Sequence, residues 1–342
     1  MIQCHNCMQS PAADIIGICV NCLRNTSSTE SLIDVHGQVR DKYGLPQFPP
    51  RSSTGINCSL CANRCQLSEG HTGYCGLHKN KEGRLVHQYP KNAAMAYMYL
   101  DLLPTNCCAA WFCKGSREQG YNLAVFLYGC NFNCLFCQNA SHKNLFEASY
   151  ITQDKMVEAA IDDKVRCICF FGGSPEPQLP YTLKLAQRII AESNNTKHIC
   201  WEWNGCGNPK LVSKAAELAA ESGGTIKFDL KAFHPQIVQA LCGVDNKQSF
   251  ENFKMIAHDN STCKILTATT LLVPYYVDRN EIECIAKYIA EINSNIPYSL
   301  LVFHPDFYMT DLPTTPRNQV TSCYSVASHY LKKVNIGNKH LI

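Results

Sequence analysis

The sequence predicts an α/β protein with a parallel sheet that is buried on both faces. From residue 121 onward, short apolar runs alternate with longer amphipathic segments. The candidate strands are 123–129, 166–173, 198–205, 225–232, 263–273 and 298–305, with a last short strand at 333–337. The candidate helices are 153–162, 179–193, 209–222, 249–258, 279–293 and 317–332. This alternation is typical of βα units. Six such units fit an open, partial barrel as well as a doubly wound sheet.

Composition narrows the class of protein. A chain of 342 residues with 46% hydrophobic residues is long enough for one large domain and a small one. The net charge of +3 does not indicate binding to nucleic acid or to a membrane surface. No apolar run reaches the roughly 18 residues of a membrane span, and the start of the chain lacks a secretory pattern. We therefore expect a cytoplasmic protein.

The 22 cysteines carry more information. Many stand in C-x-x-C pairs of a long chain without a signal peptide, which favours reduced, metal-binding thiolates over disulfides. The compartment should then be reducing and anaerobic. The chain divides into four expected parts. They are a zinc-ribbon-like Cys4 module at 1–24, a linker at 25–55 with one short helix at 31–42, a Cys-rich subdomain at 56–120 and the α/β domain at 121–342.

Two N-terminal sets of cysteines have metal-binding spacing. Cys4, Cys7, Cys19 and Cys22 follow C-x2-C-x11-C-x2-C, which predicts a structural zinc ion. A role of this module in docking a partner stays open, although no basic or aromatic run indicates nucleic acid. The second set is Cys58, Cys61, Cys65 and Cys75. It can hold zinc as a structural staple, which we favour, or an iron–sulfur cluster that relays electrons.

A third set follows the first predicted strand. GCNFNCLFCQN places Cys130, Cys134 and Cys137 in a C-x3-C-x2-C spacing. Three thiolates can hold three irons of a [4Fe–4S] cube and leave the fourth iron open, as a catalytic metal requires. A structural zinc loop or a coincidence is the alternative, because such a spacing is modest evidence in a chain this rich in cysteine.

The position of other unusual residues favours the cluster. Ligands of parallel βα folds bind at the carboxyl ends of the strands. GGSPEP, WNG, DLK and FHP all fall at or near predicted strand ends, as does the three-Cys loop. The sequence therefore predicts a single active site at this edge of the sheet.

Several longer segments match a known family. CSLCANRCQLSEGHTGYCGL, GCNFNCLFCQN, KFDLKAF, TTLLVPYYVD, FHPDFYMTDLPTTP and VNIGN resemble blocks of the radical S-adenosylmethionine (SAM) superfamily. Within it, the chain resembles the pyruvate formate-lyase-activating-enzyme group and its AmmeMemoRadiSam-system branch over about residues 56–342. The resemblance implies a partial (β/α)6 TIM-like barrel, here with Cys-rich N-terminal metal-binding subdomains. It also implies that a [4Fe–4S] cluster binds SAM, whose reductive cleavage yields a 5′-deoxyadenosyl radical that abstracts hydrogen.

The resemblance also assigns roles to the strand-end residues. Gly172 and Gly173 belong to the loop that contacts the methionyl amino group of SAM, although here Ser174 replaces the usual acid or amide before the proline and Glu176 follows it. The remaining implied SAM-site residues, which also include acids that help hold a monovalent cation, are Glu202, Asn204, Asp229, Lys231 and His304. The plainer alternatives are a tight glycine turn, an Asp–Lys salt bridge and a core histidine.

Substrate and partners are less determined. The resemblance implies a one-electron donor such as ferredoxin or flavodoxin, and a possible protein substrate that loses a glycine hydrogen. Modification of a small molecule or a nucleic acid base, and an inactive metal-binding scaffold, are the alternatives. We expect four further cysteines to pack as small hydrophobic residues in strands: Cys167, Cys169, Cys200 and Cys263. Cys107, Cys108 and Cys113 have no assigned role, although Cys113 could ligate a metal or carry a radical.

Overall fold

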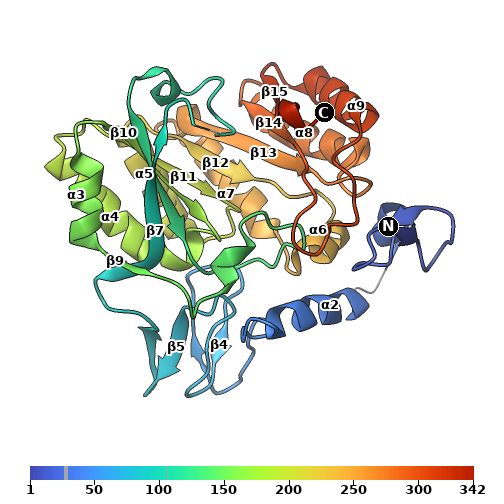
Figure 1. Ribbon diagram of the computed structural model, residues 1–342, viewed down its shortest axis with the longest axis horizontal. Coiled ribbons are helices and arrows are strands. Elements are labelled where there is room, and N and C mark those ends of the chain that lie inside the picture. The colour runs from blue at the N-terminus through green and yellow to red at the C-terminus, as the bar shows by residue number, and fades with distance from the viewer. Residues whose placement is uncertain (27–29, 106) are drawn as a thin grey trace.

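A nine-stranded sheet dominates the computed structural model, which describes residues 1–26, 30–105 and 107–342 (Figure 1). Seven neighbouring strands run parallel, and the prediction of a parallel α/β sheet is confirmed. They are β8 (Tyr121–Leu127), β10 (Val165–Gly172), β11 (His198–Trp203), β12 (Ile226–Asp229), β13 (Leu266–Leu272), β14 (Tyr298–Val302) and β15 (Val334–Gly337). Their side chains are largely buried, as expected for strands that are covered on both faces.

The order of these strands distinguishes the two architectures that the sequence left open. The parallel strands lie side by side in chain order, whereas a doubly wound sheet reverses its order at a switch point. Because right-handed crossovers in one direction place every helix on the same face, successive helices should touch. They do so from α3 (Gln153–Ile161) to α9 (Arg317–Tyr330), with α6 (Pro235–Cys242) alone outside this row. The fold is therefore a partial barrel with one outer layer of helices.

The helices of the barrel lie where the sequence predicts them. They are α3 (Gln153–Ile161), α4 (Leu179–Glu192), α5 (Pro209–Glu221), α7 (Lys247–His258), α8 (Arg279–Asn293) and α9 (Arg317–Tyr330). The additional helix α6 (Pro235–Cys242) was not predicted. It ends at Gly243, which has a φ of 72° and terminates the helix in the left-handed region. α6 packs against the N-terminal helices α1 (Val20–Arg24) and α2 (Glu30–Asp41) instead of the outer layer.

The sheet also extends beyond the predicted barrel. β7 (Ala93–Leu102) pairs antiparallel with β8, and β9 (Tyr150–Thr152) pairs antiparallel with β7. β7 lies within the range 56–120 that the sequence assigns to the Cys-rich subdomain. Tyr97 on β7 stacks on Phe126 of β8 with ring centroids 4.6 Å apart. The sheet therefore begins before residue 121.

The N-terminal parts carry short elements. The Cys4 module contains the pair β1 (Ile2–Gln3) and β2 (Pro11–Ala12), and α2 confirms the helix expected in the linker. Residues 27–29 of that linker lie outside the described residues. Two hairpins follow, made of β3 (Ile56–Asn57), β4 (Gln66–Leu67), β5 (His78–Lys81) and β6 (Arg84–His87). Short 3-10 helices lie at η1 (Gly115–Arg117), η2 (Ala140–Lys143), η3 (Glu176–Gln178), η4 (Cys263–Ile265) and η5 (Lys339–Leu341). Within the described ranges, no helix is both long and apolar enough to cross a bilayer.

Candidate active site

The three-Cys loop follows β8 directly and lines a cavity of about 190 Å³ at the carboxyl edge of the sheet. Strand ends far apart in the sequence meet at this cavity because the parallel strands share one edge. Besides Cys130, Cys134 and Cys137, the cavity is lined by the predicted residues Gly172, Gly173, Glu202, Asn204, Asp229 and Lys231. The structure thus brings together nine of the residues that the sequence singled out.

His304 is the predicted residue that lies apart. It follows β14, its side chain is half-exposed, and its Nδ1 lies 3.1 Å from Asp306 Oδ2. It does not occur among the described residues that line the cavity. Its role near the adenosine of SAM stays a prediction.

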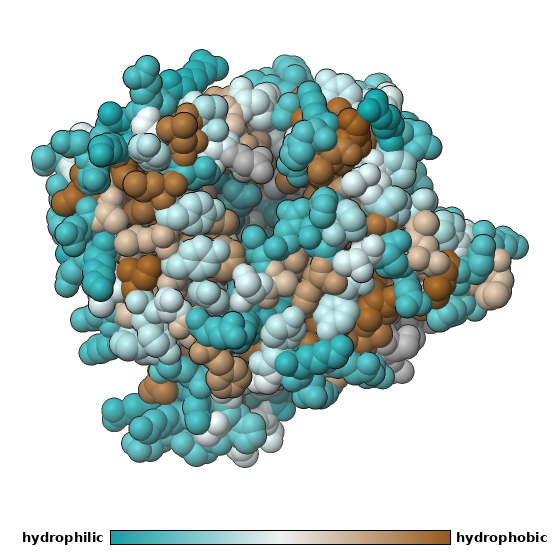
Figure 2. Space-filling view, viewed as in Figure 1, coloured by the Kyte–Doolittle hydropathy of each residue, from teal (hydrophilic) through white to brown (hydrophobic). Residues whose placement is uncertain are grey.

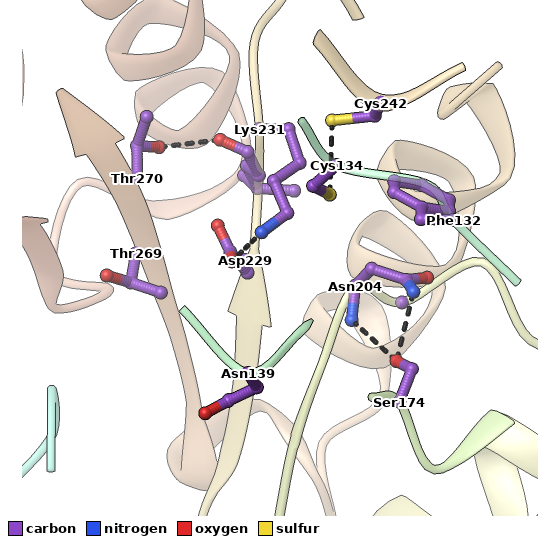
Figure 3. A network of polar contacts seen from close by, with 12 residues as sticks. Phe132, Cys134, Asn139, Ser174, Asn204, Asp229, Lys231, Cys242, Thr269 and Thr270 are labelled. Atoms are coloured by element: carbon purple, nitrogen blue, oxygen red, sulfur yellow. Dashed lines mark hydrogen bonds and ion pairs between the residues drawn. The ribbon is translucent and has the colours of Figure 1, made fainter. Parts of the chain in front are cut away.

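A buried polar network joins the loops after β10 and β11 (Figure 3). Asn204 Nδ2 donates to Ser174 Oγ at 2.9 Å and to Asn131 Oδ1 at 2.7 Å. Ser174 Oγ in turn donates to the fully buried Glu176 carboxylate, whose other oxygen accepts from the Gly205 amide at 2.7 Å. Ser174 lines the cavity, whereas Glu176 does not and ties the two loops together.

Burial raises the pKa of Glu176 to about 7. Because the folded protein binds this proton more tightly than the unfolded chain, the stabilising contribution is complete below about pH 4.5 and is lost as the pH rises to about 7. Glu176→Gln should remove this dependence, which is on the order of 3 kcal/mol. Thermal unfolding at about pH 5 and pH 8 should show the variant gaining stability relative to the native chain at the higher pH. Glu217→Gln, at an exposed carboxylate on α5, is the control. Parallel pH profiles for Glu176→Gln and the native chain would contradict this account.

Asp229 and Lys231 form an ion pair at the end of β12 (Figure 3). Burial opposes the charge on Lys231, yet the adjacent Asp229 carboxylate raises the pKa of the ammonium well above its usual range. Asp229 Oδ1 remains buried without a hydrogen-bond partner in the described part of the chain, as do His142 Nδ1 and Trp203 Nε1. All three residues line the cavity. Because unpaired buried polar groups are costly, the cavity fits a polar ligand that supplies the missing partners.

The two glycines after β10 have a physical role of their own. Gly172 has a φ of +114°, a region that side chains avoid. A Cβ atom at Gly173 would lie 2.2 Å from the carbonyl oxygen of Gly129. The glycines therefore allow this loop to pack on the loop after β8, in addition to lining the cavity.

Two buried cations beside the cysteines were missed by the sequence analysis. Lys143 Nζ donates to Asn133 Oδ1 at 2.8 Å, and Arg40 on α2 lies 3.4 Å above the ring of Tyr74. Burial lowers the pKa of both groups, and thiolates of the three-Cys loop counteract that effect. These cations can offset the negative charge of a thiolate-bound cluster. No motif marks them, because each comes from an element outside the loop.

Cys242 is a further thiol at the site. It ends α6, and its Sγ lies 3.4 Å from Cys134 Sγ (Figure 3). The hydrogen bond between the two sulfurs lowers the pKa of Cys134 to about 7. The sequence offered no signal for this contact, since α6 itself was not predicted.

The three cysteine sets differ in how closely their sulfurs approach. The ligand atoms of Cys4, Cys7, Cys19 and Cys22 lie within 4.8 Å of one another, as expected around one metal ion. Among the described residues, one other group of potential ligand atoms is this close together, namely those of Cys107, Cys108 and Glu202. The second set and the three-Cys loop are more widely spaced. Wider spacing suits an iron–sulfur cluster, in which each thiolate binds a different iron.

The second set lies against the three-Cys loop. Asn63 Nδ2, between Cys61 and Cys65, donates to the backbone oxygen of Asn131 at 2.8 Å. A Cβ atom at Gly129 would lie 3.0 Å from the Cys75 carbonyl oxygen. The four thiols of the set are buried or nearly so, and burial raises their pKa values. The two sets are therefore neighbours in the fold.

Comparison with known proteins identifies the class of domain to which the sheet and the cysteine-lined cavity belong. Residues 124–289 match the profile described as the radical SAM superfamily, so the predicted resemblance is confirmed for this part of the chain. Such a domain implies a [4Fe–4S] cluster and SAM as cofactors. The narrower branch suggested by the sequence stays a prediction.

The similar proteins include three from Methanocaldococcus jannaschii. An uncharacterized protein is 27% identical over 83% of this chain and 81% of its own length. Two putative glycyl-radical enzyme activating enzymes are 22% and 24% identical over 62% of this chain, and over 87% and 79% of their own lengths.

Two solved structures are also similar. A domain of pyruvate-formate lyase-activating enzyme from Bacteroides vulgatus is 18% identical, with a TM-score of 0.41 over 50% of this chain and 98% of that chain. SuiB of Streptococcus suis, bound to S-adenosylmethionine, is 15% identical, with a TM-score of 0.46 over 61% of this chain and 48% of that chain.

Proposed function

We propose that this protein is a radical SAM enzyme that abstracts hydrogen from a substrate held at the carboxyl edge of the barrel. The observation that carries the proposal is the 190 Å³ cavity, which joins three cysteines to unpaired buried polar atoms. A [4Fe–4S] cluster with SAM supplies, when bound, one-electron cleavage of SAM to a 5′-deoxyadenosyl radical. Cys130, Cys134 and Cys137 would hold the cluster.

The chain's own residues supply binding and orientation. Asp229 and Lys231 form a fixed pair of opposite charges, which suits the amino and carboxylate groups of an amino acid. Ser174 and Asn204 are held by each other and add polar contacts on the opposite wall. Gly172 and Gly173 complete the proposed SAM site, and Glu202 stands on the wall that it shares with the neighbouring cavity. Phe132, Phe136 and Leu271 form apolar walls that exclude water from the reacting atoms.

The substrate is a separate part of the proposal. The names of two relatives, putative glycyl-radical enzyme activating enzymes, support a protein substrate. A ferredoxin- or flavodoxin-like protein would then supply the electron. A second candidate is a small molecule. It is supported by a cavity of about 350 Å³ that adjoins the proposed SAM site and is large enough for such a substrate.

The other metal centres serve structure and electron supply. Cys4, Cys7, Cys19 and Cys22 would bind a structural zinc ion, since their four sulfurs lie within 4.8 Å of one another. The Cys19 amide also donates to Cys4 Sγ at 3.3 Å, an arrangement that stabilises a thiolate. The second set lies next to the three-Cys loop, and its sulfurs are more widely spaced. Both features favour an iron–sulfur cluster over a zinc ion, and such a cluster would pass electrons to the active site.

Anaerobic reconstitution with iron and sulfide tests the function. After reduction and addition of SAM, we expect 5′-deoxyadenosine to form. Cell extract separated by ultrafiltration should stimulate its formation, from the retained fraction if the substrate is a protein and from the filtrate if it is a small molecule. Failure to form 5′-deoxyadenosine with a fully loaded cluster, whichever fraction is added, would refute the proposal.

A further inference from the structure

A second cavity lies beside the proposed SAM site, inside the barrel. Its volume is about 350 Å³, and both cavities are lined by Gln138, Asn139, Phe171, Glu202 and Leu301. Figure 2 shows a hollow near the centre of the face that Figure 1 presents, over the same sheet. The two cavities therefore share a wall on which Glu202 stands.

Six cysteines line this second cavity: Cys107, Cys108, Cys113, Cys167, Cys169 and Cys200. Cys167 and Cys200 are buried in strands, as expected, but together with Cys169 they also line this cavity. Side chains two apart on a strand share a face, and the parallel register pairs Cys169 with Cys200. All three thiols therefore point to the inner face of the barrel. Cys263 instead lies in η4, away from both cavities.

Three potential ligand atoms converge in this cavity. The sulfurs of Cys107 and Cys108 and one carboxylate oxygen of Glu202 lie within 4.8 Å of one another. A tetrahedral zinc ion with bonds of about 2.3 Å to sulfur needs sulfurs about 3.8 Å apart. The separation of these three ligand atoms is therefore close to what a single zinc ion requires. The four sulfurs of the Cys4 module lie within the same 4.8 Å of one another.

A buried lysine adjoins the same atoms. Lys227 Nζ lies 3.3 Å from Cys107 Sγ, 3.1 Å from Cys169 Sγ and 3.2 Å from Glu202 Oε2. With both thiols ionised as ligands, two thiolates, one carboxylate and one ammonium sum to a charge of −2. A divalent cation would bring the sum to zero. Lys227 would then donate hydrogen bonds to the ligands from outside the coordination shell.

The donor set selects the kind of ion. Thiolates prefer zinc and other soft or borderline metals, whereas monovalent cations and Mg²⁺ prefer oxygen. Three protein ligands leave one tetrahedral position for water or another molecule, as in catalytic zinc sites. Asn122 Oδ1 also lines this cavity and is buried without a hydrogen-bond partner among the residues described. The surroundings therefore suit a polar molecule next to the ion.

We propose that Cys107, Cys108 and Glu202 bind a zinc ion whose open coordination position holds a sulfur, nitrogen or oxygen donor of a molecule in this cavity. Binding releases the thiol protons to solvent and changes no oxidation state. The site goes beyond SAM cleavage and does not require it. Because the ion would lie in the cavity next to the proposed SAM site, it could position a substrate for hydrogen abstraction.

Zinc counting on the reconstituted full-length protein, without SAM, tests the site. After loading with zinc and removal of the excess, Cys107→Ser/Cys108→Ser should bind about one zinc less per chain than the native protein, with unchanged iron. Cys113→Ser is the matched control, because it removes a thiol from the same cavity and leaves the three ligands in place. It should retain the native zinc content.

A second measurement on the native protein covers the case in which the double variant does not fold. Zinc should slow alkylation of Cys107 and Cys108 by at least about tenfold, as read by mass spectrometry of peptides. Alkylation of Cys113 should not change. Equal zinc contents in the native protein and a folded double variant, or alkylation of Cys107 and Cys108 that zinc leaves unchanged, would overturn the proposal. Neither result would bear on 5′-deoxyadenosine formation.

Discussion

Cys134→Ala should reduce 5′-deoxyadenosine formation to background in the reconstituted, reduced protein. Cys134 is the middle member of the three-Cys loop, and a [4Fe–4S] cube held by three thiolates has no protein ligand to spare. Cys242 Sγ lies 3.4 Å away on α6, outside the three-Cys loop, and we expect that it does not replace the missing ligand. Both the product and the SAM-induced change in the electron paramagnetic resonance signal of the cluster should disappear.

Cys263→Ala is the control for this variant. Cys263 lies in η4 and donates to the Asn260 carbonyl oxygen at 3.7 Å, outside both cavities. This variant should keep native iron content at the catalytic cluster and native product formation. A Cys134→Ala protein that still forms 5′-deoxyadenosine at the native rate would exclude the three-Cys loop as the catalytic cluster site.

Glu281→Ala should lower the free energy of unfolding by about 3–5 kcal/mol, the cost of removing one partner from a buried ion pair. The Glu281 carboxylate on α8 is fully buried and accepts hydrogen bonds from Arg24 at 2.9 Å and from the amides of Phe233 and His234 at 2.8 and 3.0 Å. Arg24 belongs to α1 of the Cys4 module. The substitution leaves this largely buried guanidinium beside Asp278 with one of its two carboxylate partners missing.

Urea unfolding and hydrogen exchange measure this effect. Exchange should accelerate most in residues 1–24 and in the loop before α6, the two segments that Glu281 joins to α8. Glu283→Ala on the same helix is the matched control, because Glu283 is partly exposed and pairs with Lys287 at 2.9 Å. Its effect on the free energy of unfolding should be much smaller, because exposed ion pairs contribute little. Equal effects of the two substitutions would show that Glu281 does not anchor the module.

Much of the fold was predictable because its signals are local. Each barrel strand is an apolar run, and each outer helix is an amphipathic segment of the right length. α6 was not predicted because it has only eight residues and lies within the connection between β12 and α7. β7 was missed because its side chains are buried at one end and exposed at the other, so neither a continuous apolar run nor a clean alternation is present.

The active site was predictable where its residues stand in local motifs. Cys130, Cys134, Cys137, Asp229 and Lys231 each stand in a short motif at a strand end, and the parallel topology then brings those ends together. The buried cations Arg40 and Lys143 and the thiol of Cys242 belong to no motif. Their approach to the cluster loop depends on how α2, η2 and α6 pack, which no local pattern encodes.

The same contrast applies to the cysteines as a whole. Spacing along the chain is enough to define the three-Cys loop and the Cys4 module, because all ligands of each lie within one short segment. The grouping of Cys107, Cys108 and Glu202 spans about a hundred residues of sequence. It arises only when the loop after β7 folds over the inner face of β10 and β11, since side-chain direction in a sheet depends on register with its neighbours. Long-range contacts of this kind follow from packing, and spacing along the chain carries no record of them.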